Sequence, residues 1–128
     1  MLPRLARVKV VDASGAGWLQ TFHVYRGSFH RAASLGDFIK GSVTHVAFYP
    51  RYRRGKRYRP LRVGHIVRAL VVQTRHPVRF ADDTRATFLA NAGVLLRSRG
   101  NLRTKLNPHL LCRAVRRRRY EAVFAAFV

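Results

Sequence analysis

The chain has very few acidic residues. Only 5 of its 128 residues are Asp or Glu, against 26 Lys and Arg, which leaves a formal net charge of +21. A surface that serves solubility alone mixes both signs, and like charges at this density repel one another and destabilise the compact state. All but four of the cations are arginine, whose planar guanidinium makes paired contacts to phosphate oxygens and stacks on bases. The imbalance therefore indicates a polyanionic partner, which we interpret as nucleic acid.

Cysteine and long apolar runs are also scarce. Cys112 is the only cysteine, which excludes an internal disulfide framework. No apolar run approaches the roughly 20 residues of a membrane-spanning helix. Hydrophobic residues still make up 48% of the chain, which excludes a disordered basic tail and indicates one domain with a single core. The basic start is similar to that of a transit peptide, but it runs directly into a strand pattern, so we expect no removable segment.

No catalytic or metal-ligating constellation stands out in the sequence. His109 and Cys112 have half of a zinc-site spacing, but there is no second cysteine and no second compact pair. Cys112 lies in an apolar stretch and is interpreted as a small core residue. Asp82 and Asp83 are adjacent in a turn, so their side chains should diverge, whereas acid–base hydrolysis needs a facing pair. We expect no enzyme activity, no metal and no cofactor.

Period-two alternation predicts the first strands. Residues 6–10 alternate apolar residues with cations, as a half-buried strand does. A second alternation puts Phe22 and Val24 on one face and Thr21 and His23 on the other. Turn formers separate these strands from their neighbours: Asp12 precedes the second strand and Gly36–Asp37 follows it. Residues 26–37 are expected to be a loop.

Three further segments complete the predicted strand set. Residues 39–48 and 66–74 form a third and a fourth strand, and the apolar run Leu70–Val72 indicates that the fourth is buried on both faces. Residues 86–96 supply a fifth strand or a broken pair. Five short strands in meander order predict a mainly β fold, a small closed five-stranded β-barrel.

The end of the sequence changes from a strand period to a helix period. Asn107–Pro108 is suited to an N-cap followed by the first helical residue, and apolar residues within 120–127 recur at i, i+3, i+4 and i+7. Val115 and its apolar neighbours are expected to face the barrel. The prediction is a barrel over residues 1–106 with a helical tail over 107–128 packed on it, in a single domain.

Three basic segments are predicted to bind RNA. The arm from Tyr49 to Pro60 has six cations, three tyrosines and no carboxylate, a mixture that suits stacking on unpaired bases while binding phosphates. Its alternative is a solvated loop. Residues 97–107 are expected to be basic, irregular and extended, and a phosphate near 116–119 would offset the repulsion between these arginines and the helix dipole. The predicted RNA-binding residues are Arg51, Tyr52, Arg53, Arg54, Lys56, Arg57, Tyr58, Arg59, Arg97, Arg99, Arg103, Arg116, Arg117, Arg118 and Arg119.

The most specific pattern is a spaced motif in the second half of the chain. It reads Ala69–Leu70–Val71–Val72, nine residues, Asp82, five residues, Phe88, two residues, Asn91, two residues, then Val94–Leu95. Together with the segments Val11–Ala16 and Ala33–Lys40, it resembles the family of the universal large-subunit ribosomal protein L-fourteen. That family has Gly where this chain has Asp83. We expect the turn to survive, because Asp tolerates left-handed backbone geometry.

The resemblance implies a structural role. Such proteins are five-stranded barrels on the subunit-facing side of the large ribosomal subunit. They bind large-subunit rRNA, pack on neighbouring ribosomal proteins and touch small-subunit rRNA in an intersubunit bridge. A ribosome-silencing factor docks on them in bacteria and mitochondria. The arm and the segment between Thr104 and Val115 depart from the family pattern, which favours a mitochondrial member over a bacterial or plastid one.

Two alternatives use the same charge differently. The first is a free RNA-binding module, an RNA chaperone or regulator on an OB-like barrel; the spaced motif disfavours it. The second is a membrane-active protein that uses its arginine-rich C-terminal helix. An amphipathic helix that docks on the barrel or on a neighbouring protein is the more common arrangement.

Overall fold

The computed structural model describes residues 1–25, 27, 31–48, 60–97, 100–104, 112 and 115. Within these residues the ordered elements are strands, and none of the described residues belongs to an assigned helix element. None of them forms a helix long and apolar enough to cross a membrane. The strands are β1 (Leu2–Pro3), β2 (Arg7–Val10), β3 (Ala16–Val24), β4 (Ala32–Ala33), β5 (Phe38–Val46), β6 (Ile66–Gln73), β7 (Val78–Arg79), β8 (Arg85–Ala86) and β9 (Ala92–Leu96).

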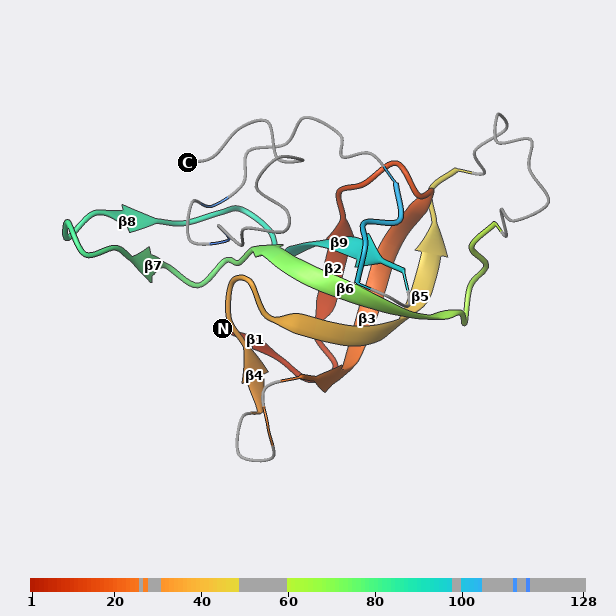
Figure 1. Cartoon of the computed structure of the whole chain (residues 1–128), viewed down its shortest axis with the longest axis horizontal. Coiled ribbons are helices and arrows are strands. Elements are labelled where there is room, and N and C mark those ends of the chain that lie inside the picture. The colour runs from red at the N-terminus through yellow and green to blue at the C-terminus, as the bar shows by residue number, and fades with distance from the viewer. Residues whose placement is uncertain are drawn as a thin grey trace.

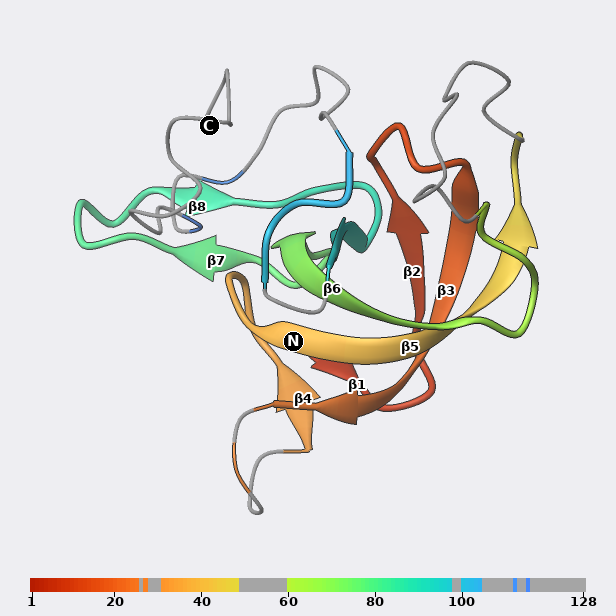
Figure 2. The same cartoon turned by 45° about the vertical axis from the view of Figure 1, so that its right-hand side comes forward.

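A closed barrel organises the molecule, with strand order β2-β3-β5-β6-β9. Consecutive strands in this order are antiparallel, and β9 closes the barrel by pairing with β2 in parallel. An odd number of up-and-down strands requires one such parallel pair. Figures 1 and 2 show the strongly curved barrel strands, with the β7–β8 hairpin extending to one side. The predicted five-stranded barrel in meander order is confirmed.

Two apolar clusters lie on the two faces of the barrel wall. Val8, Leu19 and Ile39 are fully buried inside the barrel, and each such side chain stabilises the fold by about 1.5–3 kcal/mol. On β6, Val71 belongs to this inner cluster, whereas its neighbours Leu70 and Val72 belong to a second cluster outside. The prediction that Leu70–Val72 is buried on both faces is therefore confirmed.

The predicted facing of β3 is wrong beyond Leu19. Thr21 is fully buried together with Val24, whereas Phe22 and His23 are both exposed. The reason is a register shift between Thr21 and His23 in the pairing with β5. A β-bulge places an extra residue on one strand and so changes which side chains face inward. Strict alternation over this stretch therefore grouped Phe22 with Val24, although the two side chains lie on opposite faces.

The region predicted as a fifth strand or a broken pair is broken. Its start belongs to β8, which pairs with β7 in a short hairpin, and its end is β9 in the barrel wall. The predicted loop over 26–37 also contains a short strand, since β4 pairs with β1. Leu2 and Ala33 of this pair are fully buried in the inner cluster, so the pair covers part of the barrel core.

The chain folds back after β9 instead of extending. The N–H of Arg97 donates to the carbonyl of Asn101 at 2.7 Å, and that of Arg103 donates to the carbonyl of Leu95 at 2.9 Å. An isolated bridge joins Leu96 to Leu102. The described part of 97–107 is therefore a turn that continues the pairing of β9, because its backbone groups bond to the strand they follow.

The predicted helical tail lies almost wholly outside the described residues, so both the helix and the division at 106/107 stay predictions. Of residues 107–128 the structure describes only Cys112 and Val115. Both are fully buried, in the cluster that also contains Leu70, Val72 and Val94. At these two positions, at least, the tail packs against the outer side of β6 and β9.

Candidate nucleic-acid interface

Most of the predicted RNA-binding residues fall outside the described residues: all those in 51–59, Arg99 and all those in 116–119. The structure describes Arg97, which is exposed, and Arg103, which is half-buried. Both lie in the segment that folds back on β9. Their roles in RNA binding stay predictions.

Asp12, predicted only as a turn former, connects distant parts of the barrel. Its Oδ1 accepts a hydrogen bond from the N–H of Ser14 at 2.9 Å, and its Oδ2 accepts one from the N–H of Leu95 at 2.8 Å. Only 3% of its surface is exposed. Burial raises the pKa of Asp12, and the bonds from Ser14 and Leu95 and the nearby charge of Arg103 oppose that rise. Arg103 thus interacts electrostatically with an anion of its own chain.

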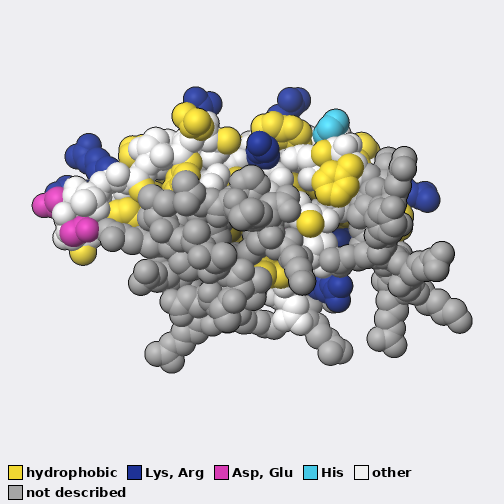
Figure 3. All heavy atoms as spheres, turned by 90° about the horizontal axis from the view of Figure 1, so that it is seen from above, with side chains coloured by type: hydrophobic (Ala, Val, Ile, Leu, Met, Phe, Trp, Pro, Cys, Tyr) yellow, Lys and Arg dark blue, Asp and Glu magenta, His cyan; other side chains and the backbone are white. Residues whose placement is uncertain are grey.

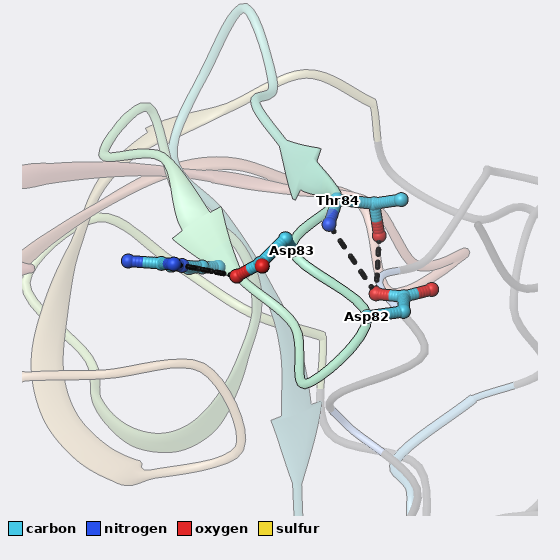
Figure 4. Close-up of polar contacts among 4 residues, drawn as sticks. Asp82, Asp83 and Thr84 are labelled. Atoms are coloured by element: carbon cyan, nitrogen blue, oxygen red, sulfur yellow. Dashed lines mark hydrogen bonds and ion pairs between the residues drawn. The ribbon is translucent and has the colours of Figure 1, made fainter.

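The other described carboxylates are also held by their own chain. In Asp37, Oδ2 accepts a hydrogen bond from the N–H of Ser34 at 2.7 Å, which closes the turn before β5. At the β7–β8 tip, Asp82 accepts a bond from the hydroxyl of Thr84 at 2.6 Å, and Asp83 accepts one from Nε of Arg79 at 2.9 Å. Figure 4 shows the Asp82 and Asp83 carboxylates pointing in different directions. The predicted divergence is confirmed, and the pair lacks the facing geometry of an acid–base site.

Asp83 also has the left-handed backbone expected of it, with φ of 59°. Its N–H donates to the carbonyl of Phe80 at 3.1 Å, and the N–H of Phe80 donates to the carbonyl of Thr84 at 2.9 Å. The turn survives with Asp where glycine was expected. Asp is one of the few side chains that enter this region at low cost.

The outer face of β3 exposes aromatic side chains that the sequence reasoning did not single out. Trp18 and Phe22 are each 40% exposed, and Tyr25, which follows the strand, is 41% exposed. The signal was present in the sequence. Leu19 and Thr21 point inward, and Trp18, Gln20 and Phe22 occupy the alternate outward positions. Strand alternation counted from Leu19, instead of from Val24, places Trp18 and Phe22 on the outer face.

Cations flank these aromatic side chains on the neighbouring strands. Lys9 of β2 lies directly opposite Trp18, and Lys40 of β5 lies opposite His23. The guanidinium carbon of Arg68 lies 4.9 Å from the ring centroid of Tyr25, a cation–π contact. Figure 3 shows lysine and arginine side chains interspersed with apolar ones along the molecule, with the acidic side chains at the end of the β7–β8 hairpin. We name Arg7, Lys9, Trp18, Phe22, His23, Tyr25, Lys40, His45 and Arg68 the basic aromatic face.

Histidine, cysteine and acidic side chains were the candidates for metal binding and nucleophilic chemistry. The part of the chain that the structure describes contains no group of three or more His, Cys, Asp or Glu side chains placed to hold a metal ion. Cys112 is a free thiol and fully buried, consistent with its interpretation as a core residue. His109, the other half of the zinc-like spacing, lies outside the described residues.

The barrel, the spaced motif and the cationic surface agree with a comparison against families of known proteins. The family model of ribosomal protein L14p/L23e matches residues 1–126, which include the barrel and nearly all of the predicted tail. A match of this extent does not favour a free RNA-binding module. The chain therefore belongs to the ribosomal protein L14p/L23e family, whose members are structural constituents of the large ribosomal subunit and not enzymes.

Proposed function

We propose that this chain binds large-subunit rRNA through the cations outside its barrel and is held by that contact as a fixed part of the ribonucleoprotein. The observation that carries the proposal is the family match over residues 1–126. The net charge of +21 supports it, since a fold with this self-repulsion is stabilised when phosphates neutralise it.

The distribution of charge indicates which surface would meet the rRNA. Asp12 and Asp37 accept backbone hydrogen bonds, and Asp82 and Asp83 lie together at the tip of the β7–β8 hairpin. The basic aromatic face contains none of these four carboxylates. Its cations, with those predicted in the arm, would contact phosphate oxygens, which fix position without reading sequence.

The finer parts of the proposal concern partners and compartment. Neighbouring ribosomal proteins, small-subunit rRNA at an intersubunit bridge and a ribosome-silencing factor are proposed partners, because the family resemblance implies them. Translation in the mitochondrial matrix is the proposed setting. The support for it is the departure of the arm and of residues 104–115 from the family pattern.

Sedimentation of cell extracts tests the assignment to the subunit. A tagged full-length chain, expressed in its own cells, is followed through a density gradient at high magnesium and again after magnesium is lowered to separate the subunits. We expect it with the large subunit under both conditions, and the same experiment on isolated mitochondria tests the compartment. Recovery only in the free-protein fraction would contradict the proposal.

A further inference from the structure

The basic aromatic face contains an open depression with its own set of lining residues. Its volume is about 330 Å³, and Arg7, Trp18, Thr44 and His45 line it. Small-molecule sites in proteins begin at about 300 Å³, so the depression is large enough for a single planar group. It lies where β2, β3 and β5 are neighbours in the barrel wall.

Local features fix the backbone at Trp18, whose side chain lines this depression. The pairing of β3 with β5 shifts register on both sides of Trp18, and β-bulges of this kind change the direction of a side chain. The carbonyl of Trp18 also accepts a hydrogen bond from the hydroxyl of Thr44 at 3.3 Å. The backbone at Trp18 is therefore fixed by β5, through both the register shifts and the hydrogen bond from Thr44.

Gly17 makes room for the second wall of the depression. A Cβ atom at this position would lie 2.6 Å from Nδ1 of His45, so the imidazole occupies the space that any other residue would fill. His45 is also the cross-strand partner of Trp18. The missing side chain at Gly17 thus lets an imidazole lie beside an indole.

The charge around the depression favours one class of occupant. Lys9 is directly opposite Trp18 on β2, and Arg7, two residues along the same strand, lines the depression. No carboxylate is among the described lining residues. An exposed indole beside two cations is an arrangement that suits stacking of an unpaired base and binding of the phosphates next to it.

We propose that the depression is a base-binding site, in which an unpaired RNA base stacks on Trp18 while Arg7 and Lys9 bind its flanking phosphates. The proposal rests on the RNA-binding function above and adds a discrete site that the arm and tail do not supply. His45 borders the base and offers its edge a ring nitrogen. A protein neighbour would need to present an acidic group beside an apolar one to use the same surface.

Trp18 is the only tryptophan in the chain, so its fluorescence reports on this site alone. The experiment titrates a six-nucleotide single-stranded RNA into the purified full-length protein, and in parallel an abasic oligomer with the same number of phosphates. We expect saturable quenching by the RNA and none by the abasic oligomer. Quenching that is equal for both, or absent while the labelled RNA binds, would overturn the base site and leave RNA binding intact. Failure of both oligomers to bind would overturn the RNA-binding function itself.

Substitutions then separate stacking from general contact. With a fluorescently labelled RNA, we expect Trp18→Leu to weaken binding by roughly 5- to 150-fold, the range measured for loss of one base–aromatic stack. Trp18→Phe keeps a ring and is expected to retain most of the affinity. Phe22→Leu is the matched control, because Phe22 has the same exposed fraction on the same strand but does not line the depression. Equal losses in Trp18→Leu and Phe22→Leu would contradict a discrete site.

Digestion of assembled subunits identifies the occupant in the ribosome. Oxidation of Trp18 by hydroxyl radicals is measured in purified large subunits before and after ribonuclease treatment, by mass spectrometry of the peptide that contains this residue. If RNA occupies the depression, accessibility rises on digestion. A Trp18 that stays shielded after the RNA is removed would show that a protein covers the site and would overturn the proposal.

Discussion

At the scale of single residues, Asp12 shows how one buried side chain connects segments far apart in sequence. It bonds to Ser14, two residues away, and to Leu95, 83 residues away. The local Asp–Ala–Ser–Gly pattern predicts the turn, because turn formers act on their own neighbourhood. Nothing local to residue 12 indicates Leu95, because that contact exists only once β9 closes the barrel.

Replacing Asp12 tests this connection. In Asp12→Ala, the N–H groups of Ser14 and Leu95 stay buried without an acceptor, and each such group costs about 1–3 kcal/mol. We expect a loss of about 2–6 kcal/mol in the free energy of unfolding, measured by urea denaturation of the full chain. Asp12→Asn keeps one carbonyl acceptor and should lose less. A loss below about 0.5 kcal/mol in Asp12→Ala, the range of ordinary surface changes, would contradict the assigned role.

The pH dependence of stability gives a second test of Asp12. Because burial raises its pKa above the ordinary value of 3.8, the folded state holds the proton more tightly than the unfolded state does. The contribution of Asp12 to the free energy of unfolding is therefore most favourable below pH 3.8. This contribution falls as the pH rises from 3.8 to the raised pKa, and it is constant above the raised pKa. The difference in unfolding free energy between wild type and Asp12→Asn should fall over this window. A difference that rises with pH would contradict it.

Two opposing contributions to stability meet at Asp83: the strain of a left-handed backbone and an exposed ion pair with Arg79. Asp83→Gly removes the strain at φ of 59°, and loses the pair with Arg79, in which both side chains are largely exposed. Such pairs contribute about 0–1 kcal/mol, so the variant should match or slightly exceed wild type in urea. Asp83→Val should be less stable by about 1–2 kcal/mol, since a branched side chain is poorly tolerated there. Equal stability of the two variants would show that the turn imposes no such requirement.

At the scale of the elements, alternation predicted where the strands lie better than which way their side chains point. The inner and outer residues of β2 and β6 follow the sequence pattern because their pairing is regular at those positions. In β3 the register shift between Thr21 and His23 puts Val24 on the inner face with Thr21 and leaves Phe22 outside, and a bulge has no reliable mark in a single sequence. The aromatic row on β3 was missed because Phe22 was grouped with Val24 instead of with Trp18.

Close approach of β3 and β5 gives a prediction at this scale. A Cβ at Gly41 would lie 2.7 Å from the carbonyl oxygen of Gln20, a backbone atom that cannot move without shifting the strand. Gly41→Ala should therefore lower the unfolding free energy by about 1–3 kcal/mol, the usual cost of overpacking. Gly17→Ala is the control, because its nearest contact is the movable His45 ring. Gly41→Ala no less stable than Gly17→Ala would contradict the close approach.

At the scale of the whole molecule, the charge sets how binding responds to salt. If about ten phosphates are neutralised, the logarithm of the affinity for rRNA should fall with that of salt concentration at a slope of about −7 to −9. Arg54→Ala should reduce the steepness by about 1. Tyr58→Ala, the matched control, should weaken binding by about 1–3 kcal/mol with the slope unchanged. Unchanged affinity in Tyr58→Ala would assign that tyrosine to packing.

Charge, barrel and family could all be predicted from the sequence, because composition and motif spacing are properties of the chain alone. The contact surface could be predicted only in part. The clusters in 51–59 and 116–119 are contiguous in sequence, whereas the basic aromatic face is assembled by pairing from β2, β3 and β5.

The central claim is that this chain serves one fixed RNA, the rRNA of the large subunit. The most direct measurement is ultraviolet crosslinking in living cells, followed by sequencing of the RNA fragments attached to the purified chain. We expect the fragments to map to a few segments of large-subunit rRNA, with additional small-subunit fragments if a bridge is formed. Fragments spread over many messenger RNAs, without enrichment of large-subunit rRNA, would contradict the account.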